Sequence, residues 1–169
     1  YAHPLADAEA YKERLAALRD RIKAAARKDG GAVESTSSWT VNGNAAEGRR
    51  MVDQTSKLML RAYNAEADSL VRSLRAHRRD ASVERLSKTM ESIAKLGKSM
   101  SIRISAGYHR LRVEELWLTA DYLAKVEEEK QASREAREAL REQRRVDQEL
   151  AKAREKLDKE REHYANALA

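Results

Sequence analysis

Residues 100–122 read MSIRISAGYHRLRVEELWLTADY, and the spacing of their apolar side chains changes partway along. At the start, Met100, Ile102 and Ile104 alternate with polar residues, and this period of two predicts a short extended segment. Ser105 follows as a candidate helix N-cap. The apolar residues after it keep helical spacing, at Tyr108, Leu111, Leu118 and Tyr122. The stretch therefore predicts a β element that leads directly into a helix.

This last helix has no proline to end it, so we expect it to continue unbroken past Arg145. Residues 125–162 contain 12 Lys or Arg and 12 Asp or Glu, with many opposite charges three or four positions apart. Leu150, Leu157 and Tyr164 are spaced by seven, which is a heptad pattern over only two heptads. Two interpretations stay open for this segment, namely a solvated helical spacer and a weak coiled-coil homodimer.

Three more helices are predicted upstream. The first covers residues 7–28 and is ended by Gly30 and Gly31, the second covers residues 45–74, and the third follows Asp80, a candidate N-cap, and ends near Gly97. Their apolar stripes are, in chain order, Tyr11, Leu15, Leu18 and Ile22; Met59, Tyr63, Leu70 and Leu74; and Val83, Leu86, Met90 and Ile93. We therefore predict a mainly α fold, with a helical domain over residues 1–123 and a charged helical extension over residues 124–169.

Residues 38–51, SWTVNGNAAEGRRM, interrupt this helical pattern. Residues 39–41 are strong β-formers, and we expect them to pair with residues 100–105, or to lie beside them, in a small ribbon. Asn42 and Gly43 supply the positive φ angles of a tight turn, and Gly48 suits a place where another segment approaches the helix closely. A phosphate-binding loop is the weaker interpretation, because the glycines lack the Gly-Lys-Ser/Thr ending. We expect Trp39 to be buried against the last helix near Trp117 or Leu118, with both tryptophans in the core.

Composition excludes several classes of function. The chain has no cysteine, so disulfides and thiolate catalysis are excluded, and its four histidines are too scattered for a metal cluster. No apolar run approaches the roughly 20 residues that span a bilayer. We therefore expect a cytoplasmic protein without cofactor or metal, and we expect no catalytic residue in this segment. The chain starts at Tyr1 rather than at Met, so we expect a fragment, and a membrane anchor in a preceding segment is left open.

The net charge of +6 is concentrated in the middle of the chain, where residues 45–112 contain 15 basic and 7 acidic residues. On a helical wheel, five cations of the second predicted helix fall within an arc of about 60°, opposite its apolar stripe. These form the predicted basic ridge: Arg50, Lys57, Arg61, Arg72 and Arg75. Asp68 interrupts the ridge. The basic ridge has two interpretations, namely a sequence-independent surface for nucleic acid and an ordinary solvated face.

Two glutamates, Glu66 and Glu115, lie beside apolar stripes and need partners. A di-metal site is disfavoured, because neither has a histidine three residues on. We expect instead a buried salt bridge to Arg103 or Arg49. Asn64 is expected to bond backbone near the Asn-Gly turn.

Four of these motifs also carry a resemblance: WTVNG at residues 39–43, EG at 47–48, LRAYNAE at 60–66 and EL at 115–116. With them the chain resembles a bacterial and phage domain of unknown function that precedes a GIY-YIG type nuclease, of the class named after an open reading frame of phage T5. The resemblance implies a non-catalytic targeting or regulatory module, with the nuclease downstream in the same chain and phage DNA as a target. No nuclease signature occurs within these residues themselves.

The sequence leaves two other classes of function to consider. One is a structural module that dimerises or sets spacing and binds protein partners but no nucleic acid. The other is an independent hydrolase, for which the sequence offers no nucleophile and base pair.

Overall fold

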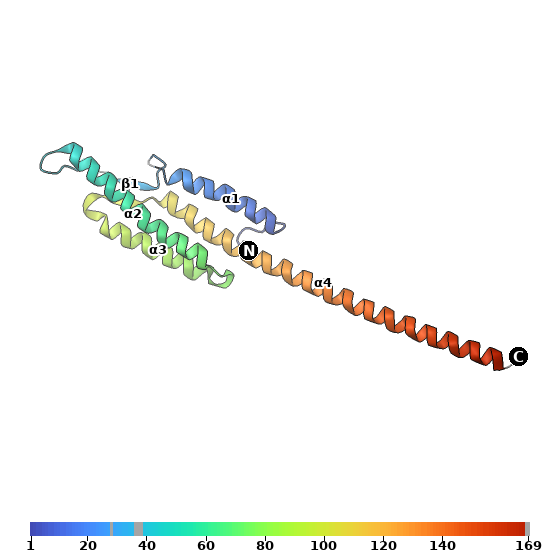
Figure 1. Ribbon diagram of the computed structural model, residues 1–169. Coiled ribbons are helices and arrows are strands. Elements are labelled where there is room, and N and C mark those ends of the chain that lie inside the picture. Colours follow the sequence, from blue (N-terminus) through green and yellow to red (C-terminus); the bar gives the residue numbers. More distant parts are fainter. Residues whose placement is uncertain (28, 36–38, 168–169) are drawn as a thin grey trace. The chain divides into compact units, whose positions relative to one another are not determined.

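The computed structural model describes residues 1–27, 29–35 and 39–167, and its elements are mainly helical (Figure 1). The described elements are, in chain order, α1 Ala8–Ala25, β1 Val33–Ser35, α2 Ala45–Ser73, the 3-10 turn η1 Ala76–Arg78, α3 Arg79–Leu96, the 3-10 turn η2 Lys98–Met100, β2 Ile102–Ile104 and α4 Ala106–Ala167. The predicted fold class, helices with one short β element and a long charged carboxyl-terminal helix, is confirmed.

Helix α1 begins at Ala8, one residue after the predicted start at Asp7, which instead caps the helix, because its carboxylate accepts a hydrogen bond from the amide of Ala10 at 2.9 Å. It ends at Ala25, before the predicted limit at Lys28, which lies outside the described residues. All four residues of its predicted stripe are buried. The 3.6-residue period therefore identified the face that packs into the core.

Helices α2 and α3 lie side by side and are joined by a short turn (Figure 1). Helix α3 begins at Arg79, one residue earlier than the predicted cap, so Asp80 lies in its first turn and does not cap it. The carboxylate of Asp80 pairs instead with the neighbouring Arg79 guanidinium at 3.1 Å. An acidic side chain in the first turn still favours the positive end of the helix dipole.

The β ribbon is real, but its predicted partner was wrong. Strand β2 lies within the predicted residues 100–105, and it pairs antiparallel with β1, Val33–Ser35, rather than with residues 39–41. Ile102 and Ile104 are buried, while Arg103 points outward and pairs with Glu34 across the ribbon at 2.7 Å. Residues 33–35 are one β-branched residue followed by two polar ones, so they carry no alternation from which a strand could be recognised in the sequence.

The segment before α2 forms a tight turn, as predicted. Asn42 and Gly43 both have positive φ, at 49° and 79°, and Val41 and Asn44 form an isolated antiparallel bridge across them. Asn44 then caps α2, because its side-chain oxygen accepts from the amides of Ala46 and Glu47. A Cβ atom on Gly48 would lie 1.8 Å from the carbonyl oxygen of Trp39. Gly48 is therefore required by the close approach that the sequence predicted.

One core joins all four helices and the ribbon. Its completely buried large residues come from α1, α2, α3, β2 and α4, namely Tyr11, Tyr63, Leu86, Ile102, Leu116 and Leu118. The prediction that both tryptophans belong to this core was wrong. Trp39 is half-buried, and Trp117 is 37% exposed and lies beside the His3 ring. At Trp39 it is the backbone carbonyl that lies against α2, at Gly48.

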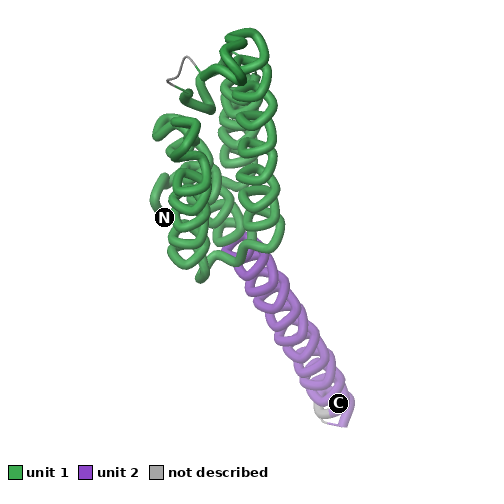
Figure 2. Tube along the Cα trace, turned by 90° about the vertical axis from the view of Figure 1, so that its left-hand side faces the viewer, with its two compact units in different colours: residues 1–126 green, residues 127–169 purple. Residues whose placement is uncertain are grey.

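Helix α4 starts as predicted, with the Ser105 hydroxyl accepting from the amide of Tyr108 at 3.1 Å, and it is continuous from Ala106 to Ala167. The prediction of an unbroken helix past Arg145 is confirmed. The chain divides into two compact units, residues 1–126 and residues 127–169 (Figure 2). The boundary lies three residues after the position predicted from the sequence, which was after residue 123. Unit 2 consists of helix α4 alone in its described residues, and the side chain of Tyr164 lies outside the described part.

Candidate functional site: a basic turn and a buried charge network

The turn between α2 and α3 gathers exposed positive charge. Helix α2 ends at Ser73, and the buried Leu74 leaves it in an extended conformation, with φ −63° and ψ 138°. The arginines around this anchor stay exposed, because only the leucine side chain enters the core. Arg72, Arg75 and Arg78 have no ion-pair partner within the part of the chain that the structure describes, and we name these three residues the basic turn.

The predicted basic ridge is altered by its surroundings. Arg50 pairs with Glu47 at 3.6 Å, and Lys57 pairs with Asp53 at 2.8 Å, both within α2. Arg75 lies beyond the end of α2, in an extended conformation, so placing it on that helix face was wrong. Arg61 and Arg72 remain on α2 as exposed cations, with no ion pair to another described residue. The unpaired cations of the predicted ridge therefore lie in the carboxyl-terminal part of α2 and just beyond its end.

The cations of the whole basic segment, residues 45–112, also divide into paired and unpaired ones. Of its 15 cations, seven pair with carboxylates, and these ion pairs include Arg79 with Asp80, Lys88 with Glu84 and Arg103 with Glu34. The other eight are exposed and have no ion-pair partner among the described residues: Arg49, Arg61, Arg72, Arg75, Arg78, Lys95, Lys98 and Arg110. Unneutralised surface charge of one sign is what attracts polyanions.

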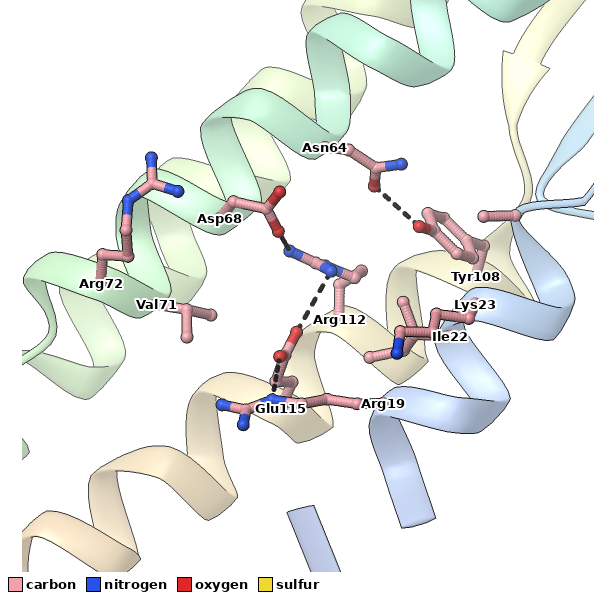
Figure 3. A pocket seen from close by; sticks show the side chains of 11 residues that line it. Arg19, Ile22, Lys23, Asn64, Asp68, Val71, Arg72, Tyr108, Arg112 and Glu115 are labelled. Atoms are coloured by element: carbon pink, nitrogen blue, oxygen red, sulfur yellow. Dashed lines mark hydrogen bonds and ion pairs between the residues drawn. The ribbon is translucent and has the colours of Figure 1, made fainter. Parts of the chain in front are cut away.

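A second feature is a charge network in the groove between α1, α2 and α4. Arg112 on α4 lies between Asp68 on α2 and Glu115 one turn further along α4, and Glu115 also meets Arg19 from α1 (Figure 3). The distance from Arg112 to Glu115 is 3.3 Å, and that from Arg19 to Glu115 is 3.2 Å. The Arg112 and Glu115 side chains are only 6% and 5% exposed. We call these four residues the charge network.

The groove has a volume of about 420 Å³. It is lined by Arg19, Ile22, Lys23, Ala26, Asn64, Asp68, Val71, Arg72, Tyr108, Arg112 and Glu115. Its formal charge is positive, with four cations against two carboxylates, and Figure 3 shows Lys23 and Arg72 on opposite sides of the network. The carboxylates already engage the buried guanidinium, so the network's first role is to join three helices.

The two glutamates singled out from the sequence have different partners from those expected. Glu115 does form a buried salt bridge, but with Arg112 and Arg19. Glu66 pairs with Arg85 of α3, and this bridge is partly exposed, since the Arg85 side chain is 67% exposed. Arg103, one expected partner, is held by Glu34, and Arg49, the other, is exposed. The pairing depends on which helices pack together, which the spacing of residues within one helix does not encode.

Asn64 also has a different role from the expected backbone contact. Its side-chain oxygen accepts a hydrogen bond from the Tyr108 hydroxyl at 2.7 Å, which joins α2 to α4. Burial raises the pKa of Tyr108, so this hydroxyl keeps its proton and acts as the donor.

Sequence reasoning missed a polar chain across the core. The Tyr63 hydroxyl lies 2.7 Å from Nδ1 of His109, and Nε2 of His109 lies 3.3 Å from the Ser87 hydroxyl. Ser87 donates its proton to the Val83 carbonyl, so it can only accept from the ring. His109 therefore donates through Nε2 and accepts at Nδ1 from Tyr63. Burial lowers the pKa of His109 and raises that of Tyr63, which stabilises both in their neutral forms.

This histidine is not arranged as a general base. A base that activates Ser87 would have to accept the serine proton, whereas that proton is bonded to a carbonyl and the only acceptor nitrogen faces Tyr63. The chain Tyr63, His109 and Ser87 therefore holds α2, α3 and α4 together. Among the described residues, no group of three or more metal-ligating side chains is found. Over the same residues, no helix combines the length and the apolar character needed to cross a membrane.

Comparison with known proteins gives one positive finding. The model of the SNIPE associated domain matches residues 8–127, so the chain belongs to this family, which is associated with GIY-YIG nucleases. The match covers unit 1 almost completely and ends one residue beyond it. Neither the curated proteins nor the solved structures contain a match to the chain.

Proposed function

We propose, from membership of the SNIPE associated domain family and from the basic turn, that this chain is a non-catalytic targeting module of a GIY-YIG type nuclease. In the fuller form of the proposal, the nuclease is of the class named after the phage T5 open reading frame, and it acts on phage DNA in bacterial defence. The module holds nucleic acid near that nuclease by contacts to phosphates. It takes no part in bond cleavage.

The observation that carries this proposal is the set of three exposed, unpaired arginines within seven residues of one turn. A guanidinium that already has a carboxylate partner must lose it to bind a phosphate, whereas Arg72, Arg75 and Arg78 have no such partner among the described residues. Arg61 extends the same charge along α2. No Phe, Tyr or Trp lies within residues 72–78, so we expect the contact to be mainly to the phosphate backbone and independent of base sequence.

The test is fluorescence anisotropy with a labelled DNA duplex at about 50 mM salt, comparing two triple variants of equal net charge. The first variant is R72Q/R75Q/R78Q in the basic turn. The matched control is R50Q/K57Q/K88Q, in which each replaced cation pairs with a carboxylate of its own helix. We expect the turn variant to weaken binding at least about tenfold and to reduce the log-log salt slope by about 2.7, since each phosphate contact contributes about 0.9. Equal weakening by both variants, or no binding by the parent chain, would contradict the proposal.

The structural alternative, a module that binds protein partners and no nucleic acid, is favoured by one observation. Unit 2 is a helix whose described side chains are all exposed, and its 11 basic and 12 acidic residues nearly cancel, so it has no positive net charge to attract a polyanion. The anisotropy experiment separates the two functions, since the alternative predicts no binding of duplex at low salt.

A further inference from the structure

Unit 2 carries an apolar seam that is longer than its leucines suggest. Along the continuous helix α4, nine residues are separated alternately by four and three positions, which places them on one face of the helix. We name them the seam: Ala132, Ala136, Ala139, Gln143, Val146, Leu150, Ala153, Leu157 and Glu160. Seven of the nine are apolar, and four are alanines. All nine are exposed to solvent.

The residues that flank the seam change sign halfway along. Asp147 and Glu149 flank it before its midpoint near Leu150, and Arg154 and Lys156 flank it afterwards. Asp147, Arg154 and Lys156 have no ion pair with another described residue, and Glu149 has only a 4.0 Å contact with Arg145. These four charges are thus available to a partner helix, in contrast to the exposed pairs within the helix, such as Glu155 with Lys159 at 2.6 Å.

We propose that unit 2 associates with a second copy of itself as an antiparallel coiled coil whose two-fold axis lies between residues 151 and 152. In this register the four flanking charges all meet opposite charges, because Glu149 lies beside Lys156 of the other copy and Asp147 lies beside Arg154. The symmetry produces each pair twice. This association does not depend on the proposed binding of nucleic acid.

The interior of the same register is also well matched. Leu150 faces Ala153 of the other copy and Leu157 faces Val146, so large residues meet smaller ones. Gln143 faces Glu160, which pairs the two polar residues of the seam with each other rather than with an apolar side chain.

A parallel dimer is disfavoured by the same residues. It would place Glu160 against its own copy in the interior, where like charges repel. It would also place Glu142 beside Asp147 and Lys156 beside Arg161, two further like-charge contacts. Only Glu149 beside Arg154 would remain favourable. The charge pattern therefore selects the antiparallel orientation, which sets the carboxyl end of each helix beside residue 136 of the other copy.

Sedimentation of the full 169-residue chain tests the association itself. We expect a concentration-dependent dimer that Leu150→Asn dissociates at least about tenfold more readily. The matched control is Ala151→Asn, which introduces the same side chain one position away from the seam. A chain that stays monomeric at about 100 μM, or equal effects of the two variants, would overturn the proposal.

Charge reversal then tests the orientation. Lys156→Glu turns two symmetry-related attractions into repulsions in the antiparallel dimer, so we expect it to weaken the dimer about tenfold. The swap E149K/K156E restores the attraction and should return affinity to the parent value. In a parallel dimer Lys156→Glu would instead relieve the repulsion with Arg161, so tighter association of this variant would overturn the proposed orientation.

Disulfide trapping provides a second readout, because the chain contains no cysteine of its own. We expect Leu157→Cys and Val146→Cys to form a disulfide with each other when the two variants are mixed, and neither variant to link to its own copy. Links within each single variant would overturn the antiparallel register.

Discussion

Helix α4 contains two pairs of opposite charges that look alike in the sequence and differ completely in their surroundings. Arg112 and Glu115 in unit 1 are three residues apart, 3.3 Å from each other and 6% and 5% exposed. Glu155 and Lys159 in unit 2 are four residues apart, at 2.6 Å, and 66% and 72% exposed. The shorter contact, between Glu155 and Lys159, contributes less to stability. In water its attraction is screened, whereas each buried charge has lost its hydration and depends on its partners.

The largest expected effect comes from breaking the buried pair. Glu115→Ala leaves the Arg112 guanidinium in the groove with Asp68 as its remaining carboxylate and also removes the partner of Arg19. We expect a loss of about 3 kcal/mol in the free energy of unfolding of unit 1, measured by chemical denaturation.

The double variant R112M/E115L sharpens this result. It removes both buried charges together and leaves only the exposed Asp68 and Arg19 without their partners, so we expect it to be more stable than Glu115→Ala alone. A double variant that is less stable than the single one would show that the network contributes net stability, contrary to this expectation.

Two glycines extend the comparison, because one is in close contact with another segment and the other has free space beside it. In Gly48→Ala the new methyl group would lie 1.8 Å from the Trp39 carbonyl oxygen, and the backbone must move, so we expect a loss of about 2 kcal/mol. In Gly107→Ala the nearest atom is the end of the Arg110 side chain at 3.9 Å, and we expect a gain of about 0.5 kcal/mol. Thermal unfolding of the two variants tests the contrast, and equal losses would contradict it.

A smaller effect is expected from pH. Burial lowers the pKa of His109 in the folded chain, so the unfolded chain binds this proton at higher pH. The stability that neutral His109 contributes is complete above about pH 6.5, the pKa of an unfolded histidine, and is lost as the pH falls below it. We expect His109→Gln to flatten the decline of the melting temperature between pH 7 and pH 5. An unchanged decline would indicate that other groups cause it.

The smallest effect is expected at the exposed pair. Glu155→Ala removes an attraction of about 0.3–0.5 kcal/mol and introduces the best helix former, so the two changes nearly cancel. We expect helicity, followed by circular dichroism, to change little at low salt and to rise slightly at high salt, where the attraction is screened and the propensity of alanine remains. A loss comparable to that of Glu115→Ala would show that the separation of the charges, rather than their burial, decides the value of a pair.

Local signals were enough to predict several elements of the fold. The Ser105 cap, the Asn42-Gly43 turn, the close approach at Gly48 and the long α4 all depend on residues near one another in the chain. Apolar periodicity also identified the buried faces of α1, α2 and α3, because 3.6 residues per turn bring each stripe to one side. For these features the sequence alone was sufficient.

Tertiary structure decided the contacts between distant segments. The strand partner of β2, the partners of Glu66 and Glu115, the bond from Tyr108 to Asn64 and the exposure of Trp117 all depend on which helix faces which. It also decided that the basic turn stays exposed, since the buried anchor at Leu74 ends α2 there. The pairing of Arg50 with Glu47 and of Lys57 with Asp53, by contrast, is local to α2 and follows from spacings of three and four residues. A side chain's own helix determines the direction in which it points, but the charge it meets there belongs to another part of the chain, and only packing brings that part within reach.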